Sequence, residues 1–453
     1  MAEVSAHQLN ELRALISGPV FARGDDGLTA EVAAYNVLVE HRPDLVVGAA
    51  SEADVAAAIH FATSHSLPLA ILSTGHGSYV NVTEGLIITT SRLTGEVAID
   101  TEARTATVLA GHRVGDVVSA AAKHGLAPVV GSSTTVSAIG YILGGGIGPL
   151  ARTYGMSSDW VRSFRVVTAQ GDIIPTDATN DPDLFWALRG GKGGFGVVTS
   201  MELELVPLES LYGGSMFFDP EHVGPVFTAW LDWTAAVPET LTSSAAIVRF
   251  PPLDFIPAPL RGKTVLQLRV AYVGDSADGE RLLAPLRGTA PALIDAVGEM
   301  AAADIGTIHG DPTDPIPLWE GSVQQLLTHA DAGFAAALLG AVGPEVNVPI
   351  VAAEVRHIGA ATRRDVPEGS AAGGRGSDYS ILLAGVPDPS LFKTVLPQIM
   401  AGVTTQLKPW LSESRLINFQ ALPASEAARN SWPGDIRARL AHVRSAYDPR
   451  GVF

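Results

Sequence analysis

The chain has 453 residues, of which 47% are hydrophobic and 17% charged, and it contains no cysteine. This length predicts two or three domains with a large core, and the lack of thiols excludes disulfides, zinc–thiolate sites and iron–sulfur clusters. The net charge of −17 disfavours binding to nucleic acid or to an anionic membrane. There is no basic N-terminal region before an apolar run, and no apolar stretch could span a bilayer, so we expect a soluble cytoplasmic protein.

The first part of the chain alternates short helices and strands. In chain order we predict helices over residues 6–16 and Leu28–Glu40, a strand at Leu45–Val47, a helix from Ser51 to Ser64 and a strand at Leu69–Leu72. The last strand leads into a loop of small residues, Ser73-Thr74-Gly75-His76-Gly77-Ser78. A strand, a helix and a strand followed by such a loop are typical of a nucleotide-binding layer.

The stretch from Gly131 to Gly148, GSSTTVSAIGYILGGGIG, is the most unusual segment of the sequence. Glycine costs conformational entropy and buries no side chain, so such a run is not built for core packing through side chains. It offers exposed backbone N–H groups and room for a flat or polyanionic ligand. The alternative is a tight packing joint between helices, and this stretch alone does not decide between the two.

After this stretch the pattern changes at Pro207. Before it we predict a hairpin of Ser163–Ala169 with Asp172–Pro175, a helix capped by Asp181, and a strand at Phe195–Val206. After it the segments are longer and prolines more frequent, with strands expected at Thr264–Val273, Ile350–Ile358 and Tyr379–Ala384 and a mobile glycine-rich loop at Ala371–Ser377. The pattern predicts an α+β unit at residues 208–404, inserted between residues 1–207 and 405–453.

Two glycine patterns match the dinucleotide-binding fingerprint, Gly191-x-Gly193-x-x-Gly196 and Gly146-x-Gly148-x-x-Ala151. The first follows a helix and leads into a strand, which is the reverse of the required order, and the second has no convincing strand before it. Neither one therefore predicts an NAD-binding Rossmann domain.

Taken in order, these segments resemble the vanillyl-alcohol-oxidase and berberine-bridge-enzyme-like flavoproteins, close to small bacterial members similar to 6-hydroxynicotine oxidase. The residues that carry the resemblance are Gly75-His76, Gly131–Gly148, Tyr154-Gly155, Asp159, Val166–Ala169, Gly171-Asp172, Asp183–Gly191, Phe195–Thr199, Leu416–Phe419 and Tyr447–Phe453. The resemblance implies an α+β fold in which a two-part, PCMH-type FAD-binding domain (1–207 and 405–453) encloses a substrate domain (208–404) that contains an antiparallel sheet.

The same resemblance implies FAD as the cofactor. His76 would link to the flavin methyl group, and the absence of cysteine, with Ser133 where doubly linked members carry one, leaves a single covalent bond. The implied cofactor-binding residues are Ser73, Thr74, Gly75, His76, Gly77, Ser78, Gly131, Ser132, Thr135, Val136, Gly140, Tyr141, Gly145, Val198 and Asn418. Val136 occupies a position where valine leaves space for O₂ beside the flavin. Taken alone, His76 would more readily be interpreted as a surface histidine in a loop, and only the surrounding motifs favour the flavin link.

The resemblance further implies an FAD-dependent oxidase that transfers a hydride from an alcohol or amine carbon to flavin N5 and reduces O₂ to hydrogen peroxide. The candidate catalytic residues are His357, Tyr379 and Asn418, with His357 and Tyr379 as possible bases. Alternation along the strand places Glu354 and Arg356 on one face, where a structural ion pair is the favoured interpretation, and His357 on the other. His309 and Trp319 flank a proline-rich segment that could line the substrate pocket, with core or loop roles equally compatible with the sequence.

Other interpretations share these motifs. A flavin dehydrogenase with another electron acceptor differs only in its reaction with oxygen, and a flavin-binding protein without turnover would keep the loops but lack a base. The expected partners are a small-molecule substrate and O₂, with no nucleic acid or membrane, in a monomer or homodimer. The histidines have no metal-ligand spacing, so we expect no catalytic metal.

Overall fold

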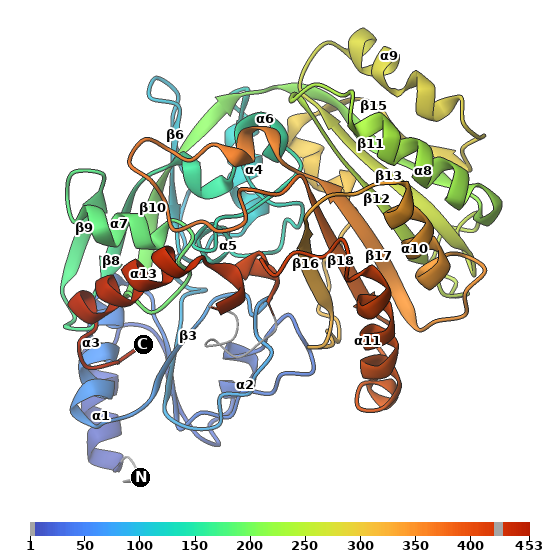
Figure 1. Cartoon of the computed structure of the whole chain (residues 1–453). Helices are drawn as coiled ribbons and strands as arrows, with labels where there is room; N and C mark the ends of the chain where they lie inside the picture. Colours follow the sequence, from blue (N-terminus) through green and yellow to red (C-terminus); the bar gives the residue numbers. More distant parts are fainter. Residues whose placement is uncertain (1–4, 421–428) are drawn as a thin grey trace.

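The computed structural model describes residues 5–420 and 429–453. Within these ranges the strands form three sheets, of four, six and eight strands. The two smaller sheets use residues up to Pro207 and the largest uses residues after it, and Figure 1 shows the two parts side by side. The predicted α+β class with an antiparallel sheet is confirmed. Residues 421–428 of the predicted C-terminal part lie outside the described residues.

The four-stranded sheet carries the small-residue loop at the end of one strand. Its order is β1 (Val20–Ala22), β2 (Leu45–Gly48), β4 (Leu86–Thr89) and β3 (Leu69–Leu72), with β2, β4 and β3 parallel. Helices α1 (Ala6–Leu15) and α3 (Glu52–Ser64) bury Leu12, Val55 and Ile59 in the same core. Ser51 caps α3 by accepting a hydrogen bond from the Asp54 backbone N–H.

The six-stranded sheet is antiparallel and is centred on one long strand. Its strands are β5 (Ala98–Asp100), β6 (Thr105–Leu109), β7 (Leu126–Pro128), β8 (Val161–Val167), β9 (Ile173–Asp177) and β10 (Val197–Pro207), and β10 pairs with β6, β7 and β8. Its helices are α4 (Val114–Ala122), α5 (Ala138–Ile142), α6 (Ala151–Tyr154) and α7 (Pro182–Leu188). The short helix α5 begins inside the glycine-rich stretch.

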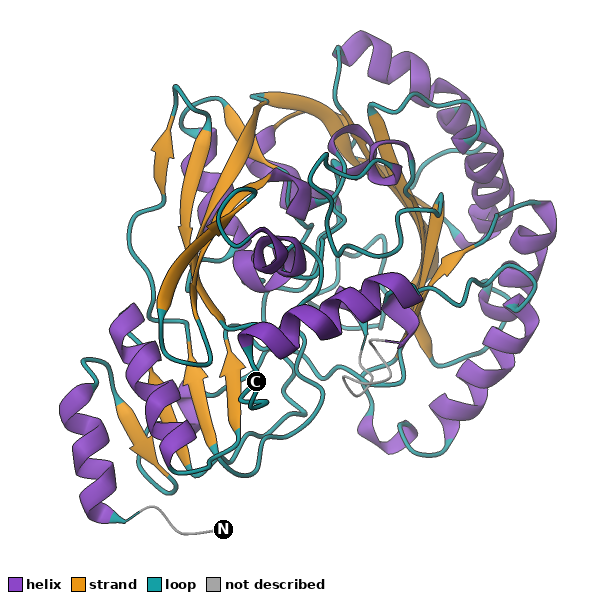
Figure 2. Cartoon of the chain, turned by 60° about the vertical axis from the view of Figure 1, so that its left-hand side comes forward, coloured by secondary structure: helices purple, strands orange, loops and turns teal. Residues whose placement is uncertain are grey.

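The largest sheet is a single antiparallel layer covered on one side by helices, as Figure 2 shows. Its strands are β11 (Ser210–Phe218), β12 (Leu241–Arg249), β13 (Thr264–Tyr272), β14 (Ile294–Asp295), β15 (Gly298–Ala301), β16 (Val323–Leu327), β17 (Ile350–His357) and β18 (Tyr379–Gly385). The accompanying helices are α8 (Val223–Thr234), α9 (Ser276–Arg287), α10 (Ala332–Val342) and α11 (Val395–Leu407).

The two faces of this sheet differ in chemistry. The helix-covered face is apolar, and residues such as Leu268, Val355 and Ile381 share a core with Phe227 and Phe334 of α8 and α10. The opposite face is polar although it is largely buried. It carries Ser215, Ser244, Gln267, Arg269, Gln324, Glu354, Arg356 and Ser380, which the strand register places beside one another. We call these eight residues the polar face.

The C-terminal segment returns to the first part of the chain. Helix α13 (Gly434–Tyr447) lies along α7, as Figure 1 shows. Arg439 forms an ion pair with Asp183 at 2.7 Å, and the Tyr447 hydroxyl donates to Asp181 at 2.7 Å. We expected the Asp181 side chain to cap α7, but it makes no such bond and accepts this long-range hydrogen bond instead.

The expected helix Leu28–Glu40 is wrong beyond its first turn. Helix α2 ends at Glu31, whose carboxylate accepts hydrogen bonds from Thr89 and Arg92. The chain then extends so that the Tyr35 backbone N–H donates to the Thr74 carbonyl at 3.1 Å. Contacts with distant segments therefore override the local helical preference.

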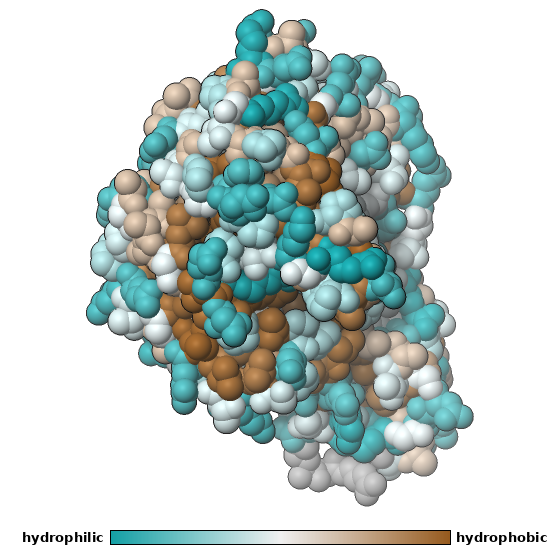
Figure 3. All heavy atoms as spheres, turned by 90° about the vertical axis from the view of Figure 1, so that its right-hand side faces the viewer, coloured by the Kyte–Doolittle hydropathy of each residue, from teal (hydrophilic) through white to brown (hydrophobic). Residues whose placement is uncertain are grey.

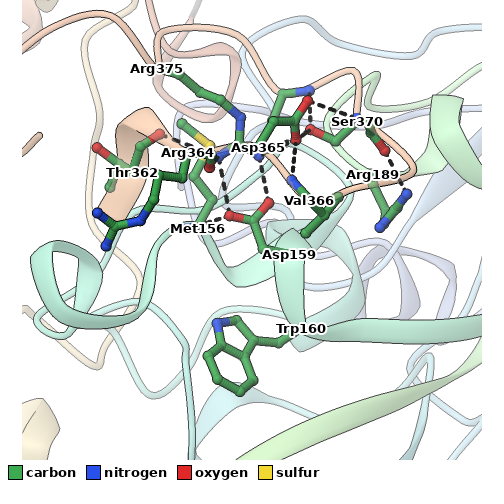
Figure 4. Close-up of polar contacts among 12 residues, drawn as sticks. Met156, Asp159, Trp160, Arg189, Thr362, Arg364, Asp365, Val366, Ser370 and Arg375 are labelled. Carbon is green, nitrogen blue, oxygen red and sulfur yellow. Dashed lines mark hydrogen bonds and ion pairs between the residues drawn. The ribbon is translucent and has the colours of Figure 1, made fainter. Parts of the chain in front are cut away.

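The segment Ala371–Ser377, expected to be a mobile loop, instead packs between the two parts of the chain. Ala371 is fully buried, and its backbone N–H donates to the Arg189 carbonyl at 2.9 Å. Arg375 points toward Asp159 in Figure 4, and the two side chains form a largely buried ion pair at 2.5 Å. The small residues of this segment allow close approach to Gly190, where a Cβ atom would collide with Ala372.

The surface over α10 and α11 carries no charged side chain along either helix. Figure 3 views the molecule from the side on which α8–α11 lie and shows hydrophobic side chains gathered on it. Val395 is among the exposed large hydrophobic residues there. None of the helices in the described ranges has the length and apolarity required for crossing a bilayer.

Candidate functional site

His76 lies in the loop after β3 and contacts both this loop and the glycine-rich stretch. Its Nδ1 lies 2.9 Å from Thr74 Oγ1 and its Nε2 lies 3.3 Å from Thr135 Oγ1. Tyr35 stacks on the imidazole with ring centroids 3.8 Å apart. Burial and the nearby Arg113 lower the pKa of His76 to about 4, so the imidazole is neutral at neutral pH. The loop and the glycine-rich stretch are thus brought together around a neutral, nucleophilic ring.

Hydrogen bonds and glycines fix the backbone on both sides of His76. Thr74 Oγ1 accepts from the Ser137 backbone N–H at 3.2 Å, and the Ser78 N–H donates to the Gly75 carbonyl. Gly75 has a φ of +70°, and a Cβ atom there would collide with Ala34. A Cβ atom on Gly77 would meet nothing within 4 Å, so the loop is open at this point.

The glycine-rich stretch wraps around the Tyr141 side chain. A Cβ atom on Gly131 or Gly146 would collide with the Tyr141 ring, so glycine is required at both positions. Burial raises the pKa of the Tyr141 hydroxyl, which therefore remains protonated. Val136 is only partly buried and joins none of the described hydrophobic clusters. Its side chain is therefore available to a ligand instead of serving the core.

Asn418 lies directly on the glycine-rich stretch. Its Nδ2 donates to the Tyr141 carbonyl at 2.7 Å, and its Oδ1 accepts from Lys192 Nζ at 2.7 Å. A Cβ atom on Gly144 would collide with the same Asn418 amide, so this contact explains that glycine. The sequence pattern indicated Asn418 as a site residue but gave no sign of Lys192.

Glu354 is the centre of a buried charge network on the polar face. Its carboxylate accepts hydrogen bonds from Arg269 at 2.6 Å, Ser244 at 2.8 Å and Arg356 at 3.0 Å. Burial opposes its ionisation, but the positive charges of Arg356 and Arg269 outweigh this effect and hold the pKa of Glu354 well below its usual range. Glu354 is therefore a carboxylate at neutral pH with both oxygens engaged.

This network faces the glycine-rich stretch. Arg269, Arg356 and His309 line one cavity together with Ile147 and Gly148 of that stretch. The Arg356 guanidinium also lies over the Phe419 ring, 5.7 Å from its centroid, next to Asn418. Sequence alternation placed Glu354 and Arg356 on one face, but their partners Arg269 and Ser244 come from other strands. The ion pair exists, and it belongs to a larger site that the sequence did not reveal.

The two candidate bases take no part in the hydrogen bonds of this network. Tyr379 and His357 are register partners, and their rings stack with centroids 5.1 Å apart. The Tyr379 hydroxyl lies 2.6 Å from Thr234 Oγ1 of α8, on the helix-covered face. Burial raises the pKa of Tyr379, and burial together with Arg152 lowers the pKa of His357 to about 3. His357 lines the same cavity as Arg356, but its Nε2 is engaged by Arg152 and its pKa is low, which argues against it as the base. Tyr379 is held against α8, which argues against it as well.

The remaining predicted residues occupy several environments. Ser132 Oγ donates to Asp311 at 2.5 Å, Gly140 N–H donates to Ser137 at 3.1 Å, and Gly145 has a φ of +91°. Ser73 donates weakly to the Ala110 carbonyl at 3.4 Å. Val198 is a buried core residue of β10, and Trp319 packs against Phe392 in the core of the large sheet. Trp319 therefore has a core role.

Buried polar atoms without a hydrogen-bond partner indicate whether the site fits FAD. In the described residues, Arg269 Nε, His309 Nδ1 and Gln324 Oε1 are buried without a hydrogen-bond partner. Native proteins rarely leave such atoms unpaired, so these groups indicate a ligand or water between the polar face and the loops. A separate cavity of about 200 Å³ is lined by the loop residues Gly77 and Ser78 and by Gln420 from the C-terminal segment. Open backbone, unpaired polar atoms and this cavity fit a flavin dinucleotide.

Comparison with known proteins agrees with this fit. Residues 43–177 match the family model described as an FAD binding domain. The (R)-6-hydroxynicotine oxidase of Paenarthrobacter nicotinovorans is 28% identical over 97% of this chain and 95% of that protein. The chain is an FAD-linked oxidoreductase with the fold of the vanillyl-alcohol-oxidase and berberine-bridge-enzyme-like oxidases.

Solved structures of this family share the fold over nearly the whole chain. The crystal structure of 6-hydroxy-D-nicotine oxidase from Arthrobacter nicotinovorans has a TM-score of 0.85 at 24% identity, covering 97% of this chain and 96% of that one. Glucooligosaccharide oxidase from Acremonium strictum has a TM-score of 0.81 at 21% identity, covering 98% of each chain, and it carries a 6-S-cysteinyl, 8α-N1-histidyl FAD.

Proposed function

We propose that this protein is an oxidase that takes a hydride from an alcohol or amine carbon of a small organic substrate and reduces O₂ to hydrogen peroxide. The observation that carries the proposal is the buried charge network of Glu354, Arg269 and Arg356 opposite the glycine-rich stretch. Charged side chains are costly to bury, so a network with unused donors at a cofactor site favours binding of a polar substrate over a purely structural role.

Bound FAD would supply the hydride acceptor and then return two electrons to oxygen. The chain's own residues bind and orient the substrate. Arg356, fixed by Glu354, presents its guanidinium beside Phe419, and Ser132 is fixed by Asp311. The balance is two electrons and one proton leaving the substrate carbon as hydride, one further proton leaving its oxygen or nitrogen, and O₂ taking up both electrons and two protons.

We further propose that FAD is held by the 73–78 loop and the glycine-rich stretch, with one covalent bond from His76. Glucooligosaccharide oxidase uses both a cysteine and a histidine. This chain has no cysteine and has Ser133 within the glycine-rich stretch, so only the histidine link is chemically open to it. The neutral imidazole of His76, whose pKa falls to about 4, suits a nucleophile that must attack the ring methyl group.

The two-part FAD-binding domain, with residues 1–207 and 405–453 around the substrate domain 208–404, is part of the same proposal. It is supported by the contacts of α13 with α7 and of Asn418 with Tyr141. Each contact joins a residue that precedes the large sheet in the sequence to a residue that follows it.

The decisive experiment is a substrate panel under anaerobic conditions. Alcohols, oligosaccharides and cyclic amines related to 6-hydroxynicotine would be mixed with the purified yellow protein, and loss of the flavin absorbance near 450 nm, roughly the usual band, would be recorded. We expect one class to bleach the flavin, and air to restore the colour with hydrogen peroxide formed. If none bleaches it while dithionite does, the protein is not this oxidase. If bleaching occurs but air does not restore the colour, the protein is a dehydrogenase.

Arg356→Met provides the residue-level test. We expect KM for the reactive substrate to rise at least tenfold, because the polar group that binds the substrate is removed. Arg364→Met is the matched control, since Arg364 is an exposed arginine on the same part of the chain and its pair with Glu239 is open to solvent. Equal KM values in the two variants would remove Arg356 from the substrate site.

A further inference from the structure

Lys192 has a backbone conformation that lysine rarely adopts. It follows α7 in the loop Gly190–Gly194 and has a φ of +66°, in the left-handed region that favours glycine. Its backbone N–H donates to the Leu143 carbonyl at 2.8 Å, within the glycine-rich stretch. Strained backbone is often found at functional sites, so the conformation of Lys192 beside the proposed cofactor segment suggests a function.

The side chain of Lys192 reaches the proposed flavin site. Its Nζ donates to the Gly140 carbonyl at 2.8 Å and to Asn418 Oδ1 at 2.7 Å. Both acceptors are neutral, and Lys192 forms no ion pair with any residue that the structure describes. An ammonium group has three donors, so one N–H remains for a further acceptor.

The charge around Lys192 is unbalanced. The glycine-rich stretch contains no charged side chain. Arg356 shares the Glu354 carboxylate with Arg269. Among the described residues, Lys192 has no carboxylate partner, and its ammonium bonds directly to a carbonyl of this segment. Burial lowers the pKa of Lys192 to about 8, which leaves most of the ammonium protonated at neutral pH and shows the cost of holding it there.

We propose that the Lys192 ammonium stabilises the negative charge that the flavin ring acquires on reduction. The proposal rests on the FAD site proposed above. A hydride brings two electrons and one proton, so a neutral oxidised ring becomes a reduced ring with one negative charge. A fixed cation in a partly buried site stabilises such a charge more than bulk water can, because the local dielectric constant is lower. Asn418 and Gly140 hold the ammonium in place.

The test compares Lys192→Met, which removes the charge, with Lys192→Arg, which keeps it. The flavin midpoint potential and the affinity for sulfite, which adds to the ring and leaves it anionic, are measured on the FAD-loaded proteins. We expect Lys192→Met to bind sulfite at least tenfold more weakly and to lower the potential by at least about 30 mV, the tenfold equivalent for a two-electron couple. Lys192→Arg should stay within about threefold of the native protein.

Two further variants keep the test decisive. Lys192→Gly removes both the charge and the backbone strain, so it should fold where Lys192→Met does not and should show the same loss of sulfite affinity. Lys408→Met, at the exposed end of α11, is the matched control and should change neither value. Native potential and sulfite affinity in Lys192→Met or Lys192→Gly would overturn the proposal. If Lys192→Met and Lys192→Gly both lose FAD while Lys192→Arg retains it, the ammonium binds the FAD diphosphate, and the proposal is again overturned.

The outcome is separate from that of the proposed oxidase function. Potential and sulfite affinity require bound flavin but no substrate, so they decide the role of Lys192 even if every alcohol and amine fails to react. Conversely, a reactive substrate with unchanged sulfite affinity in Lys192→Met would leave the oxidase standing and reject this role.

Discussion

Nη1 of Arg152 lies 2.9 Å from Nε2 of His357, and this contact fixes the protonation of the imidazole. A guanidinium can only donate, so Nε2 accepts and carries no hydrogen. Nδ1 must then carry the hydrogen, and it has no hydrogen-bond partner among the described residues. Since burial and Arg152 lower the pKa of His357 to about 3, the ring is a poor proton acceptor at neutral pH.

The first prediction is that His357 positions Arg152 and does not act as the base. His357→Gln keeps an acceptor for Arg152 and should leave the pH profile of kcat/KM unchanged. His357→Leu removes the acceptor and should lower the free energy of unfolding by about 1–3 kcal/mol, because a buried donor loses one of its partners. Denaturant unfolding and pH–rate profiles check both statements. Loss of one limb of the profile in His357→Gln would restore His357 as the base.

The second prediction concerns the charge network on the polar face. Glu354→Gln should lower the free energy of unfolding by about 3–5 kcal/mol, because Arg269 and Arg356 would remain buried without their counter-ion. Glu239→Gln is the control: its pair with Arg364 is exposed, so its loss should cost about 0–1 kcal/mol. Denaturant unfolding of both variants measures the difference, and equal losses would contradict the assigned role of the network.

The same network predicts a pH dependence. The pKa of Glu354 is depressed in the folded protein from its ordinary 4.5, so its stabilisation is complete above that pH and is lost as pH falls through the folded value. The stability gap between the native protein and Glu354→Gln should therefore be constant from pH 8 to about 5 and close at lower pH. A gap that closes on raising the pH instead would mean that the assigned sign is wrong.

The third prediction concerns the flavin bond. The colour of the purified protein should remain with the polypeptide after acid precipitation, and His76→Ala should release the flavin. His60→Ala, at an exposed histidine of α3, is the control and should keep the colour bound. Because the pKa of His76 falls to about 4, its rate of attachment to added FAD should change little between pH 7 and 5. An imidazole with the ordinary pKa of 6.5 would slow about 25-fold over that range. Colour that washes out of the native protein would contradict the covalent link.

Local sequence features were sufficient to locate the candidate cofactor segments. The 73–78 loop and the glycine-rich stretch are each continuous, and their small residues and flanking strands are visible without any tertiary contact. The polar face was not accessible in this way. Alternation placed Glu354 and Arg356 together, but Arg269 and Ser244 join them only through the register of β12, β13 and β17.

The misjudged segments share a physical cause. Glycines and alanines in Ala371–Ser377 suggested mobility, yet they serve close packing against Gly190 and lead to the ion pair of Arg375 with Asp159. Lys192 was missed because it lies in the glycine run Gly190–Gly194, where no local pattern indicates a role for its side chain. Its meaning depends on Asn418, which lies more than two hundred positions later in the sequence.

The fourth prediction concerns access of oxygen. Val136 is partly exposed and packs in none of the described hydrophobic clusters, so a larger side chain there can extend over the flavin site without disturbing the core. Val136→Leu should reoxidise at least tenfold more slowly in air, whereas Val136→Ala should be at least as fast as the native protein. Stopped-flow absorbance of the photoreduced proteins measures these rates. Identical rates in all three would remove Val136 from the oxygen path.

The reaction of the reduced flavin with oxygen tests the proposed oxidase function most directly. The native protein would be photoreduced without air and mixed with air-saturated buffer, while flavin absorbance and hydrogen peroxide are followed together. We expect complete reoxidation within seconds and one hydrogen peroxide for each flavin reoxidised. A reduced flavin that persists for many minutes in air, or that reoxidises without forming hydrogen peroxide, would contradict it.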